Sequence, residues 1–365
     1  MISPLSDTVE SCDGLVPPVP GLDLTICILN WNGVKSLVDC LEALAAIRRM
    51  NEIQYEIIVV DNGSNDGSVA TVRARFPDVE VIANSENLGF AAGNNQAIRK
   101  GSGRNFLILN NDTVPLNTCL TRMVRFLDQN PEVGIVGGRL INPDGSTQFT
   151  YYPPRLPSLR SSATDLLWID RIWPRNPWGR FAPTDSFDWE KPSLTTQISG
   201  ACLMIRREVL NQIGLFDEDF EYWYEDVDLC CRCLQAEWKI AYLPDAKIIH
   251  HGGATFSRLD FSEKSSLRFR SLLRYFQKHF SRRQVAALRI LMGAVLLLRM
   301  PLLVGLLLSP RAAVRRRFRG GMHAYFRILR EIVGFPARGA RSLSASQTCG
   351  KIKRRIAKTD SVSRP

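Results

Sequence analysis

Short apolar runs alternate with amphipathic stretches over the first 110 residues of the chain. Four runs of five or six residues, rich in branched side chains, are candidate strands: Leu24–Leu29, Glu56–Val60, Val79–Ala83 and Asn105–Leu109. The segments between them predict helices, of which Val34–Arg48 and Ala91–Lys100 are the clearest. Continuous apolar strands separated by helices are typical of a parallel sheet covered on both faces. The pattern therefore predicts an α/β fold with a mostly parallel central sheet.

Polar clusters follow three of these four runs. They are Asn30–Asn32, Asp61–Ser64 and Asn110–Thr113. Asn, Asp, Gly and Ser also dominate ordinary turns, so each cluster taken alone has a structural explanation. Ligands of parallel sheets bind beyond the carboxyl ends of the strands, and three clusters at such ends favour a binding site. The sequence has no GxGxxG after the first strand and no GxxxxGK[ST], which argues against dinucleotide-dependent oxidoreductases and P-loop proteins.

Residues 142–195 have a different character, with eight prolines and four tryptophans. This composition predicts a long irregular insertion. Its aromatic side chains could stack on sugar rings and line an acceptor groove, or they could anchor the loop to the core. The sequence leaves both interpretations open.

The charge is divided unevenly along the 365 residues. Residues 1–263 carry 23 Lys/Arg and 34 Asp/Glu, a net −11, whereas residues 264–365 carry 24 Lys/Arg and 2 Asp/Glu, a net +22. An acidic globule thus precedes a basic tail, for which a membrane surface or a nucleic acid is the natural partner. The nine cysteines form no pair of CxxC motifs, which indicates reduced thiols of a cytosolic protein. Residues 1–21 show no secretory signal and are expected to form a mobile leader.

The tail contains one long apolar run, Ile290–Leu308, interrupted by Arg299 and Pro301. A central arginine costs about 2.5–3.5 kcal/mol on insertion scales, and both flanks are basic, which argues against a single membrane crossing. We expect two short amphipathic or re-entrant segments, broken at Arg299–Pro301, at the interface of the inner leaflet. A soluble helical domain with a basic face is the alternative. Residues after Gly334 are expected to be disordered.

A candidate metal ligand follows the fourth apolar run, in the sequence LILNNDT at 107–113. A hard divalent cation commonly takes one or two protein carboxylates together with substrate phosphates. Asp112, at the end of a buried strand, suits that role. A helix cap before Pro115 is the structural alternative.

Three carboxylates, Glu225, Asp226 and Asp228, stand at the start of a predicted helix, directly after the aromatic residues Tyr222–Tyr224. The helix dipole favours negative charge there, which is also the structural explanation. A carboxylate in this position can act as a general base toward a hydroxyl. Asp228 and Arg232 are four residues apart and are expected to form a supporting ion pair.

Two adjacent histidines, His250 and His251, follow the apolar run Lys247–Ile249. Neighbouring residues of a strand point to opposite faces, so one of the two is expected to face the site. Imidazole is an accepted ligand of divalent metals. We take His250 as the candidate ligand, with His251 as the alternative.

Taken in order, these motifs resemble glycosyltransferase family 2 over Leu22 to Gly253. The matching segments are LTICILNWNG, VVDNGSNDGS, ENLGFAAGNN, LILNNDT, SGACLMIRR and LFDEDFEYWYEDVDLCCR, followed by the histidine after a strand. The resemblance implies the GT-A fold and an inverting nucleotide-sugar transferase. In detail the motifs look most like the bacterial rhamnosyltransferase-like branch that builds cell-surface glycans.

The resemblance also implies roles for individual residues. Asp226 matches the catalytic base, with Glu225 beside it. Asp112 and His250 match the ligands of Mn²⁺ or Mg²⁺, although Asn110 replaces the first acidic residue of the usual DxD motif. The residues that match the donor-nucleotide site are Asn30, Asn32, Asp61, Asn87, Gly89, Asn111 and Gly200.

We therefore expect an inverting glycosyltransferase that uses a dTDP- or UDP-linked donor, with rhamnose as one candidate sugar. Its acceptor would be a hydroxyl of a glycan or a polyprenyl-linked glycan, at the cytoplasmic face of an anionic membrane, with no nucleic acid partner. The alternatives are a non-catalytic nucleotide or nucleic-acid binder and a polymerising synthase, which would normally carry several membrane spans. The expected parts are a leader (1–21), a GT-A domain (22–260, divided into 22–140 for the nucleotide and 141–260 for acceptor and catalysis), a helical membrane-associating region (261–334) and a disordered basic tail (335–365).

Overall fold

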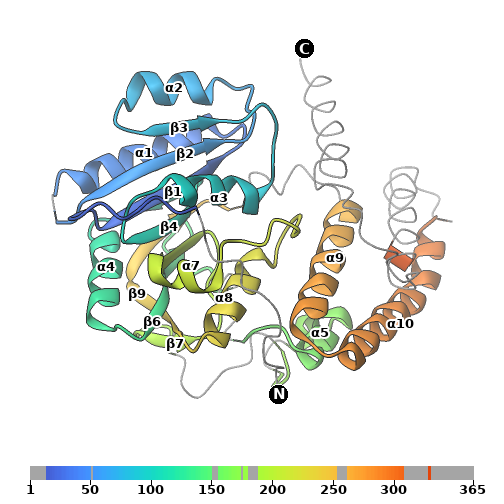
Figure 1. Ribbon diagram of the computed structural model, residues 1–365. Coiled ribbons are helices and arrows are strands. Elements are labelled where there is room, and N and C mark those ends of the chain that lie inside the picture. Colours follow the sequence, from blue (N-terminus) through green and yellow to red (C-terminus); the bar gives the residue numbers. More distant parts are fainter. Residues whose placement is uncertain are drawn as a thin grey trace, which may run out of the picture.

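Nine strands form one mixed sheet at the centre of the computed structural model (Figure 1). The structure describes residues 14–50, 52–149, 155–173, 176–179, 188–252, 261–307 and 328–329. The predicted disordered tail lies outside these residues. The strand order within the described part is β3-β2-β1-β4-β8-β6-β9-β5, and β7 pairs with β9.

The first half of the sheet is parallel. It contains β1 (Leu24–Asn30), β2 (Tyr55–Asp61), β3 (Glu80–Ala83) and β4 (Asn105–Asn110). These strands are joined by α1 (Val34–Arg48), α2 (Ser68–Arg75) and α3 (Phe90–Lys100). Right-handed crossovers place α1 and α2 on one face and α3 on the other (Figure 1). The strands and helices predicted here are confirmed to within one residue at each end.

The second half of the sheet is mixed. β8 (Cys202–Arg206) runs antiparallel between β4 and β6 (Val133–Ile141), and β6 pairs in parallel with β9 (Lys239–His250). Two short strands, β5 (Thr113–Pro115) and β7 (Ser193–Thr195), run antiparallel to β9. Six strands therefore run one way and β5, β7 and β8 the other, which confirms a mostly parallel sheet but adds antiparallel pairs that the apolar pattern did not predict.

Three more helices complete this part of the molecule: α4 (Cys119–Gln129), α7 (Arg207–Ile213) and α8 (Glu225–Gln235). The apolar residues of the strands form the main core with the inner faces of these helices. Seven cysteines of the described residues are buried free thiols. Their state agrees with the expectation of reduced cysteines.

The stretch 142–195 is less irregular than predicted. It contains α5 (Leu159–Leu166), α6 (Ile169–Ile172) and β7. The Ser158 hydroxyl accepts a hydrogen bond from the Ser161 backbone N–H and caps α5. Because the prolines lie outside these short helices, they limit the length of the helices but do not prevent them.

The structure describes the last eight residues of the predicted leader. Residues 1–13 lie outside the described part, but Val16 and Val19 contact the domain. The Val16 carbonyl accepts a hydrogen bond from Arg207, and the Val19 N–H donates one to the Ser102 carbonyl at 2.9 Å. Residues 14–21 of the expected leader thus lie against the domain through these two backbone contacts.

Two long helices, α9 (Phe261–His279) and α10 (Arg282–Leu307), stand beside the sheet, with α5 near their base (Figure 1). Their inner faces form a second hydrophobic cluster with α5 and the start of α8. The expected break at Arg299–Pro301 is wrong, because α10 continues through it to Leu307. Proline has a helix-compatible φ and removes only one backbone donor, so packing can hold a helix together across it.

Among the residues that the structure describes, no helix combines the length and the apolar character that a membrane crossing requires.

A buried ion cluster joins α9 to α8. Asp228 is fully buried, and its carboxylate accepts hydrogen bonds from His279 at 2.7 Å, Arg232 at 2.9 Å and Lys278 at 3.1 Å. Burial alone would raise the pKa of Asp228, but these three partners outweigh it and hold the pKa well below its ordinary value. The expected pair with Arg232 is thus one part of a larger cluster.

We predict that Asp228→Asn lowers the unfolding free energy by about 3–5 kcal/mol near neutral pH, because buried cations lose their counter-charge. A carboxyl whose folded pKa is depressed stabilises above its unfolded pKa, about 3.9, and loses that contribution as pH falls through the folded value. Urea unfolding should therefore show a wild-type advantage at neutral pH that shrinks below about pH 4. The control, Asp219→Asn at the exposed pair with Arg274, should change stability by less than about 1 kcal/mol. Equal stability of Asp228→Asn and wild type would contradict the prediction.

Candidate active site

The ends of four strands meet at one edge of the sheet. Asn30 pairs in register with Asp61, and Leu29 with Asn110, so β1, β2 and β4 end side by side. β8 runs the other way, and its entry residue Ala201 accepts a hydrogen bond from the Asn110 N–H at 3.0 Å. The sharp turn before β8 therefore lies at the same edge as the three polar clusters.

A cavity of about 240 Å³ opens at this edge. It brings together eight of the residues singled out from the sequence: Asn87, Gly89, Asn111, Asp112, Gly200, Glu225, Asp226 and His250. Aromatic side chains also line it, namely Trp31, Phe90, Tyr222 and Trp223. Residues more than a hundred positions apart thus share one concave site, which is the arrangement that chemistry between two bound molecules requires.

Two predicted nucleotide-site residues lie beneath the cavity rather than in its wall. Asn30 and Asp61 are buried, and the Asn30 amide donates to the Asp61 carboxylate at 2.8 Å. The other Asp61 oxygen accepts from the Ser64 N–H at 2.8 Å. Asn30 Oδ1 in turn accepts from Asn111 at 2.7 Å. This network fixes Asn111, which does line the cavity.

Asn32 joins two loops at the side of the site. Its φ of 50° is left-handed, a conformation that asparagine tolerates better than most residues. Its side-chain oxygen accepts from the Asn65 N–H, and its own N–H donates to the Ser64 hydroxyl. Asn32 therefore holds the β1–α1 loop against the β2–α2 loop.

Asn62 is a cavity residue that the sequence analysis did not single out. Its amide donates to Asn87 Oδ1 at 3.2 Å and to the Gly89 carbonyl at 3.1 Å, and so orients the loop before α3. The signal in the sequence for Asn62 is its position in the polar cluster after β2, next to Asp61. Gly89 has a φ of 93°, which explains a glycine at this point of the loop.

Asp112 and His250 form the centre of the cavity floor. The His250 Nε2 and Asp112 Oδ1 atoms are 3.4 Å apart, and both side chains are buried. His251 is exposed, so of the two histidines His250 faces the site. Gln148, which no sequence motif indicated, clamps His250 by donating to its carbonyl at 2.7 Å and facing Nδ1 with Oε1 at 2.8 Å.

This clamp fixes the chemistry of the imidazole. Because Oε1 of Gln148 can only accept, Nδ1 of His250 carries the ring proton. The Nε2 atom, on the other side of the ring, faces the Asp112 carboxylate, and in a neutral imidazole it presents a lone pair there. Such a pair of donors fits a divalent cation, and the amide behind the histidine is the support that metal-bound imidazoles usually have. Within the described residues no cluster of three or more His, Cys, Asp or Glu side chains could hold a metal. A cation here would therefore need further ligands from a substrate.

Asp226 also lines the cavity, from the first turn of α8. Its Oδ2 accepts from the Gly200 N–H at 2.9 Å, and its Oδ1 from the Val227 N–H at 2.8 Å. A Cβ on Gly200 would come within 3.0 Å of the Phe90 ring, so the close approach of this turn needs glycine. The two backbone N–H groups and the helix N-terminus stabilise the carboxylate and fix its direction.

Glu225 differs from its neighbour in its surroundings. Its side chain is 8% exposed, and its Oε2 has no hydrogen-bond partner among the described residues. Burial first, and the charge of Asp226 second, raise the pKa of Glu225 to about 8. A carboxyl group with a pKa raised in this way keeps its proton at neutral pH, a property that acid–base sites commonly use.

A strained turn presents both carboxyl groups to the cavity. Trp223 and Tyr224 have φ values of 61° and 71°, and such values are unusual for bulky residues. Tyr224 packs on Tyr275 of α9 with ring centroids 5.7 Å apart. Strain of this kind persists only where the surroundings enforce it, and it occurs most often at functional sites.

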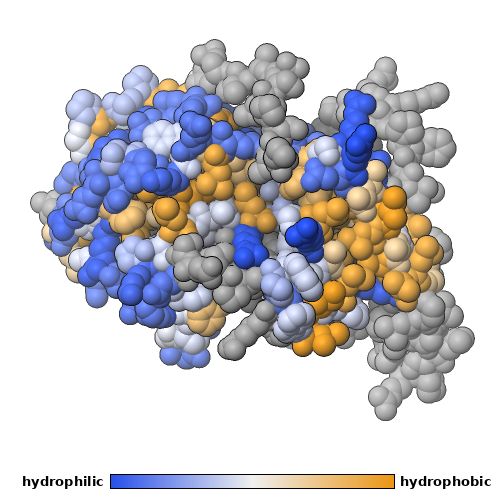
Figure 2. Space-filling model, turned by 90° about the horizontal axis from the view of Figure 1, so that it is seen from below, coloured by the Kyte–Doolittle hydropathy of each residue, from blue (hydrophilic) through white to orange (hydrophobic). Residues whose placement is uncertain are grey.

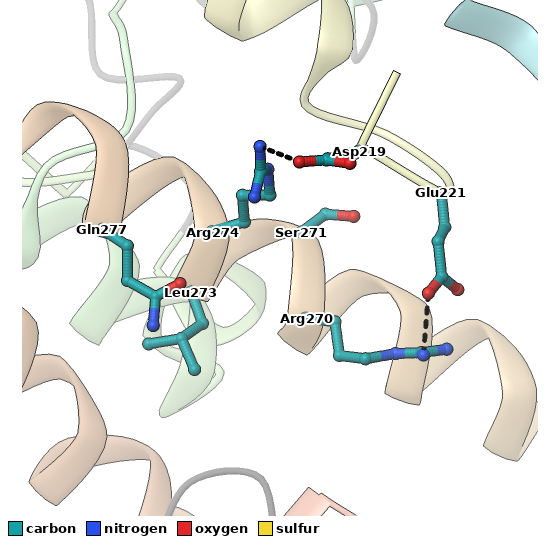
Figure 3. Close-up of a pocket in the computed structure, with 7 residues that line it drawn as sticks. All are labelled: Asp219, Glu221, Arg270, Ser271, Leu273, Arg274 and Gln277. Atoms are coloured by element: carbon teal, nitrogen blue, oxygen red, sulfur yellow. Dashed lines mark hydrogen bonds and ion pairs between the residues drawn. The ribbon is translucent and has the colours of Figure 1, made fainter. Parts of the chain in front are cut away.

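The loop before this turn is fastened to α9 around a second cavity, of about 280 Å³ (Figure 3). Arg270 forms an ion pair with Glu221 at 2.9 Å, and Arg274 with Asp219 at 2.6 Å. The Ser271 hydroxyl donates to the Tyr222 carbonyl at 2.6 Å. The C-terminal helices therefore position a wall of the main cavity.

Comparison with known families identifies the chain. The glycosyl transferase family 2 model matches residues 25–214, and the glycosyl transferase family group 2 model matches residues 182–330. The chain therefore belongs to glycosyl transferase family 2 and is a glycosyltransferase. The alternative of a non-catalytic nucleotide or nucleic-acid binder is wrong.

Rhamnosyltransferases are among its relatives. N-acetylglucosaminyl-diphospho-decaprenol L-rhamnosyltransferase of Mycobacterium tuberculosis is 29% identical over 225 residues, which cover 57% of this chain and 70% of the relative. The dTDP-rhamnosyl transferase RfbF of Shigella flexneri is 26% identical over 213 residues (56% and 63%). Among solved structures, the mannosyltransferase PcManGT of Pyrobaculum calidifontis, in complex with GDP-Man and Mn²⁺, is 16% identical with a TM-score of 0.48, covering 87% of this chain and 89% of that one.

We predict that Glu225→Gln stabilises the protein at alkaline pH. A carboxyl with a raised folded pKa opposes folding once pH exceeds its unfolded pKa, about 4.3, and the penalty is complete above the folded value. Glutamine removes that penalty, so the variant should gain a few kcal/mol over wild type at about pH 9 and little at about pH 5. Urea unfolding at both pH values measures the difference. The control is Glu221→Gln, at the ion pair with Arg270, and it should not reproduce the gain in stability at alkaline pH. An effect of Glu225→Gln on stability that is the same at both pH values would contradict the assignment.

Proposed function

We propose that the protein is an inverting glycosyltransferase that moves a sugar from a nucleoside diphosphate donor to a hydroxyl of a lipid-linked glycan. The observation that carries this proposal is the shared cavity, which the Asp112–His250 pair and Asp226 line together. The Asp112–His250 pair suits a departing diphosphate, and Asp226 suits an incoming alcohol. The expected place of action is the cytoplasmic face of an anionic membrane.

The donor nucleotide occupies the part of the cavity beside the strand ends. Asn87, Gly89, Asn111 and Gly200 contact it, and the buried Asn30 and Asp61 with Asn32 hold these contacts from beneath and from the side. Rhamnose is the preferred candidate sugar, because two relatives are named as L-rhamnosyl and dTDP-rhamnosyl transferases. A dTDP-linked donor is therefore the first choice and a UDP-linked donor the second.

Asp112 and His250 would hold a divalent cation, Mn²⁺ or Mg²⁺, with the donor diphosphate completing its ligands. Held by Asp112 and His250, such a cation would neutralise the charge that develops on the leaving diphosphate. Gln148 keeps His250 in the tautomer that can donate its Nε2 lone pair. The loss of the first DxD carboxylate at Asn110 leaves Asp112 as the charged ligand, so the affinity for the metal depends more on the substrate.

Transfer takes one step in this scheme. Asp226 accepts the proton of the acceptor hydroxyl as the hydroxyl oxygen bonds to C1 of the sugar, and the bond from C1 to the diphosphate oxygen breaks with its electron pair. General-base assistance of this kind typically contributes about 10²–10⁴-fold. Because attack and departure occur on opposite faces, the anomeric configuration inverts and no covalent enzyme intermediate forms.

Glu225 keeps its proton and is uncharged at neutral pH, because its pKa lies at about 8. A neutral acid beside the base adds no second negative charge next to the incoming oxygen, and it can donate a hydrogen bond to a sugar hydroxyl. Tyr222 and Trp223 flank this part of the cavity and offer faces on which a sugar ring can pack.

A polyprenyl-linked acceptor is proposed on two grounds. One relative is named for a diphospho-decaprenol acceptor. The basic C-terminal region, net +22 from residue 264 onward, suits an anionic membrane in which such an acceptor resides.

We predict that Asp226→Asn lowers the transfer rate by about 10²–10⁴-fold while donor affinity changes little. The amide keeps the hydrogen-bonding shape but cannot accept a proton. The measurement is release of nucleoside diphosphate in the presence of acceptor membranes, with calorimetry for donor binding. Asp78→Asn, at an exposed carboxyl group before β3, is the matched control and should retain turnover. Wild-type turnover by Asp226→Asn would rule out its role as base.

We predict that dTDP or UDP together with Mn²⁺ raises the melting temperature of the wild type and that duplex DNA does not. Gln148→Leu should weaken this metal-dependent effect by about 10–100-fold in apparent Mn²⁺ affinity, because His250 loses its support. Asp112→Asn should remove the Mn²⁺ dependence altogether. Gln277→Leu, on α9, serves as the matched control. A nucleotide effect that is the same with a chelator in all four proteins would exclude the proposed metal site.

A further inference from the structure

The outer face of α10 carries an apolar stripe exposed to solvent. Its members, spaced for one side of a helix, are Ala286, Ile290, Ala294, Leu297 and Leu298. The exposed fractions of Ile290, Leu297 and Leu298 are 73%, 63% and 72%. On a helix packed against a soluble domain this side is normally polar.

The inner face of the same helix is also apolar. Leu288, Met292, Val295 and Leu296 are buried in the cluster with α9 and α5. A helix that is apolar on both sides usually has an apolar neighbour on both sides. In the part of the chain that the structure describes, α10 has such a neighbour on its inner side alone.

A second exposed apolar group adjoins this stripe. On α6 and at its ends, Leu167, Trp168, Ile172 and Trp173 are 43%, 40%, 85% and 50% exposed. The two elements meet at Arg299, whose guanidinium lies 4.2 Å from the centre of the Trp168 ring and donates to the Leu166 carbonyl. We call these residues, with Ile290, Leu297 and Leu298, the α6–α10 face. Figure 2 shows hydrophobic residues gathered on the side of the molecule where α10 lies.

Exposed cations lie on the two helices of the α6–α10 face and on α5. Arg160 lies on α5, Arg171 on α6, and Arg282 and Arg283 at the start of α10, all of them exposed. Segments that lie in a membrane interface have this composition: leucine, isoleucine and tryptophan together with arginine. The aliphatic side chains enter the acyl boundary, tryptophan stays at the level of the headgroups, and arginine contacts lipid phosphates.

We propose that the α6–α10 face docks on the surface of an anionic lipid bilayer, with α10 lying along the interface. Charge selects this occupant. Residues 264–365, which contain α10, carry net +22, so an anionic leaflet attracts them, whereas a second copy joined through the same face would bring two such basic segments together. The tryptophans of α6 thereby take a role in lipid contact, which differs from both the sugar stacking and the core anchoring considered from the sequence.

The docking face is tied to the active site through one hydrophobic cluster. Leu296 of α10 and Tyr224 and Val227 at the start of α8 belong to it, and Trp223 packs against it. A bilayer that holds α10 therefore fixes the orientation of the wall that carries Asp226. Only this functional consequence rests on the proposed function, since it assumes a lipid-linked acceptor.

Flotation of the full-length protein with vesicles tests the proposal. Wild type should bind vesicles of phosphatidylglycerol and phosphatidylcholine, and bind pure phosphatidylcholine vesicles weakly. The double variants Ile172→Ser/Trp173→Ser and Leu297→Ser/Leu298→Ser should each reduce the bound fraction by about tenfold. Leu194→Ser and Met50→Ser, at apolar positions 52% and 49% exposed elsewhere on the surface, are matched controls and should bind as wild type. Unchanged melting temperatures verify that all variants are folded.

Three results would overturn the proposal. One is the absence of wild-type binding to the anionic vesicles. A second is wild-type binding by both double variants. The third is a shift of Leu297→Ser/Leu298→Ser from a dimer to a monomer on gel filtration without a change in vesicle binding, which would make the face an interface between copies. Turnover with a detergent-solubilised acceptor is measured separately and should be equal in wild type and both double variants, so failure of the docking face and failure of the proposed reaction are distinguishable.

Discussion

Three carboxyl groups share one largely buried cavity, and the rest of the site follows from how their charges are accommodated. Asp112 has the imidazole of His250 at 3.4 Å. Asp226 receives two backbone N–H groups at the N-terminus of α8. Glu225 is buried with its Oε2 atom lacking a hydrogen-bond partner among the described residues, and its raised pKa means that it holds a proton at neutral pH. Each carboxyl group thus has a different means of compensation, and the differences make one suited to a cation, one to a proton in transit and one to a hydrogen bond.

The C-terminal helices are part of the same electrostatic and packing system. Asp228 stands two residues after Asp226 in α8. It anchors α9 to α8 through His279 and Lys278. The aromatic pair of Tyr224 and Tyr275 holds the left-handed turn that precedes α8. The position of the general-base candidate therefore depends on α9 as much as on the sheet. A region that composition alone separates as a basic tail is, in the structure, a support of the active site.

The sequence predicted the elements whose cause is local. Strands β1 to β4 and their polar ends followed from apolar runs and turn residues, and this was enough to bring Asp112 to the correct edge of the sheet. Contacts made at long range could not be predicted in this way. Gln148 reaches His250 across 102 positions, and nothing in its neighbourhood marks it. The continuity of α10 through Pro301 depends on packing against α5 and α9, so a rule about proline alone gave the wrong answer.

The charged groups near the cavity and the apolar side chains on the outer surface meet different requirements. Inside, the carboxyl group of Asp226 is fixed by backbone positions, such as the Gly200 N–H. Outside, α6 and α10 expose large apolar side chains and also carry exposed arginines. This arrangement is unfavourable in water but favourable against lipid. An acceptor sugar on a lipid carrier has its polar head close to the headgroup layer. An enzyme that must place one hydroxyl of that head against Asp226 gains more from a fixed orientation at the surface than from affinity for the isolated sugar, because orientation reduces the entropy lost in reaching the reactive geometry.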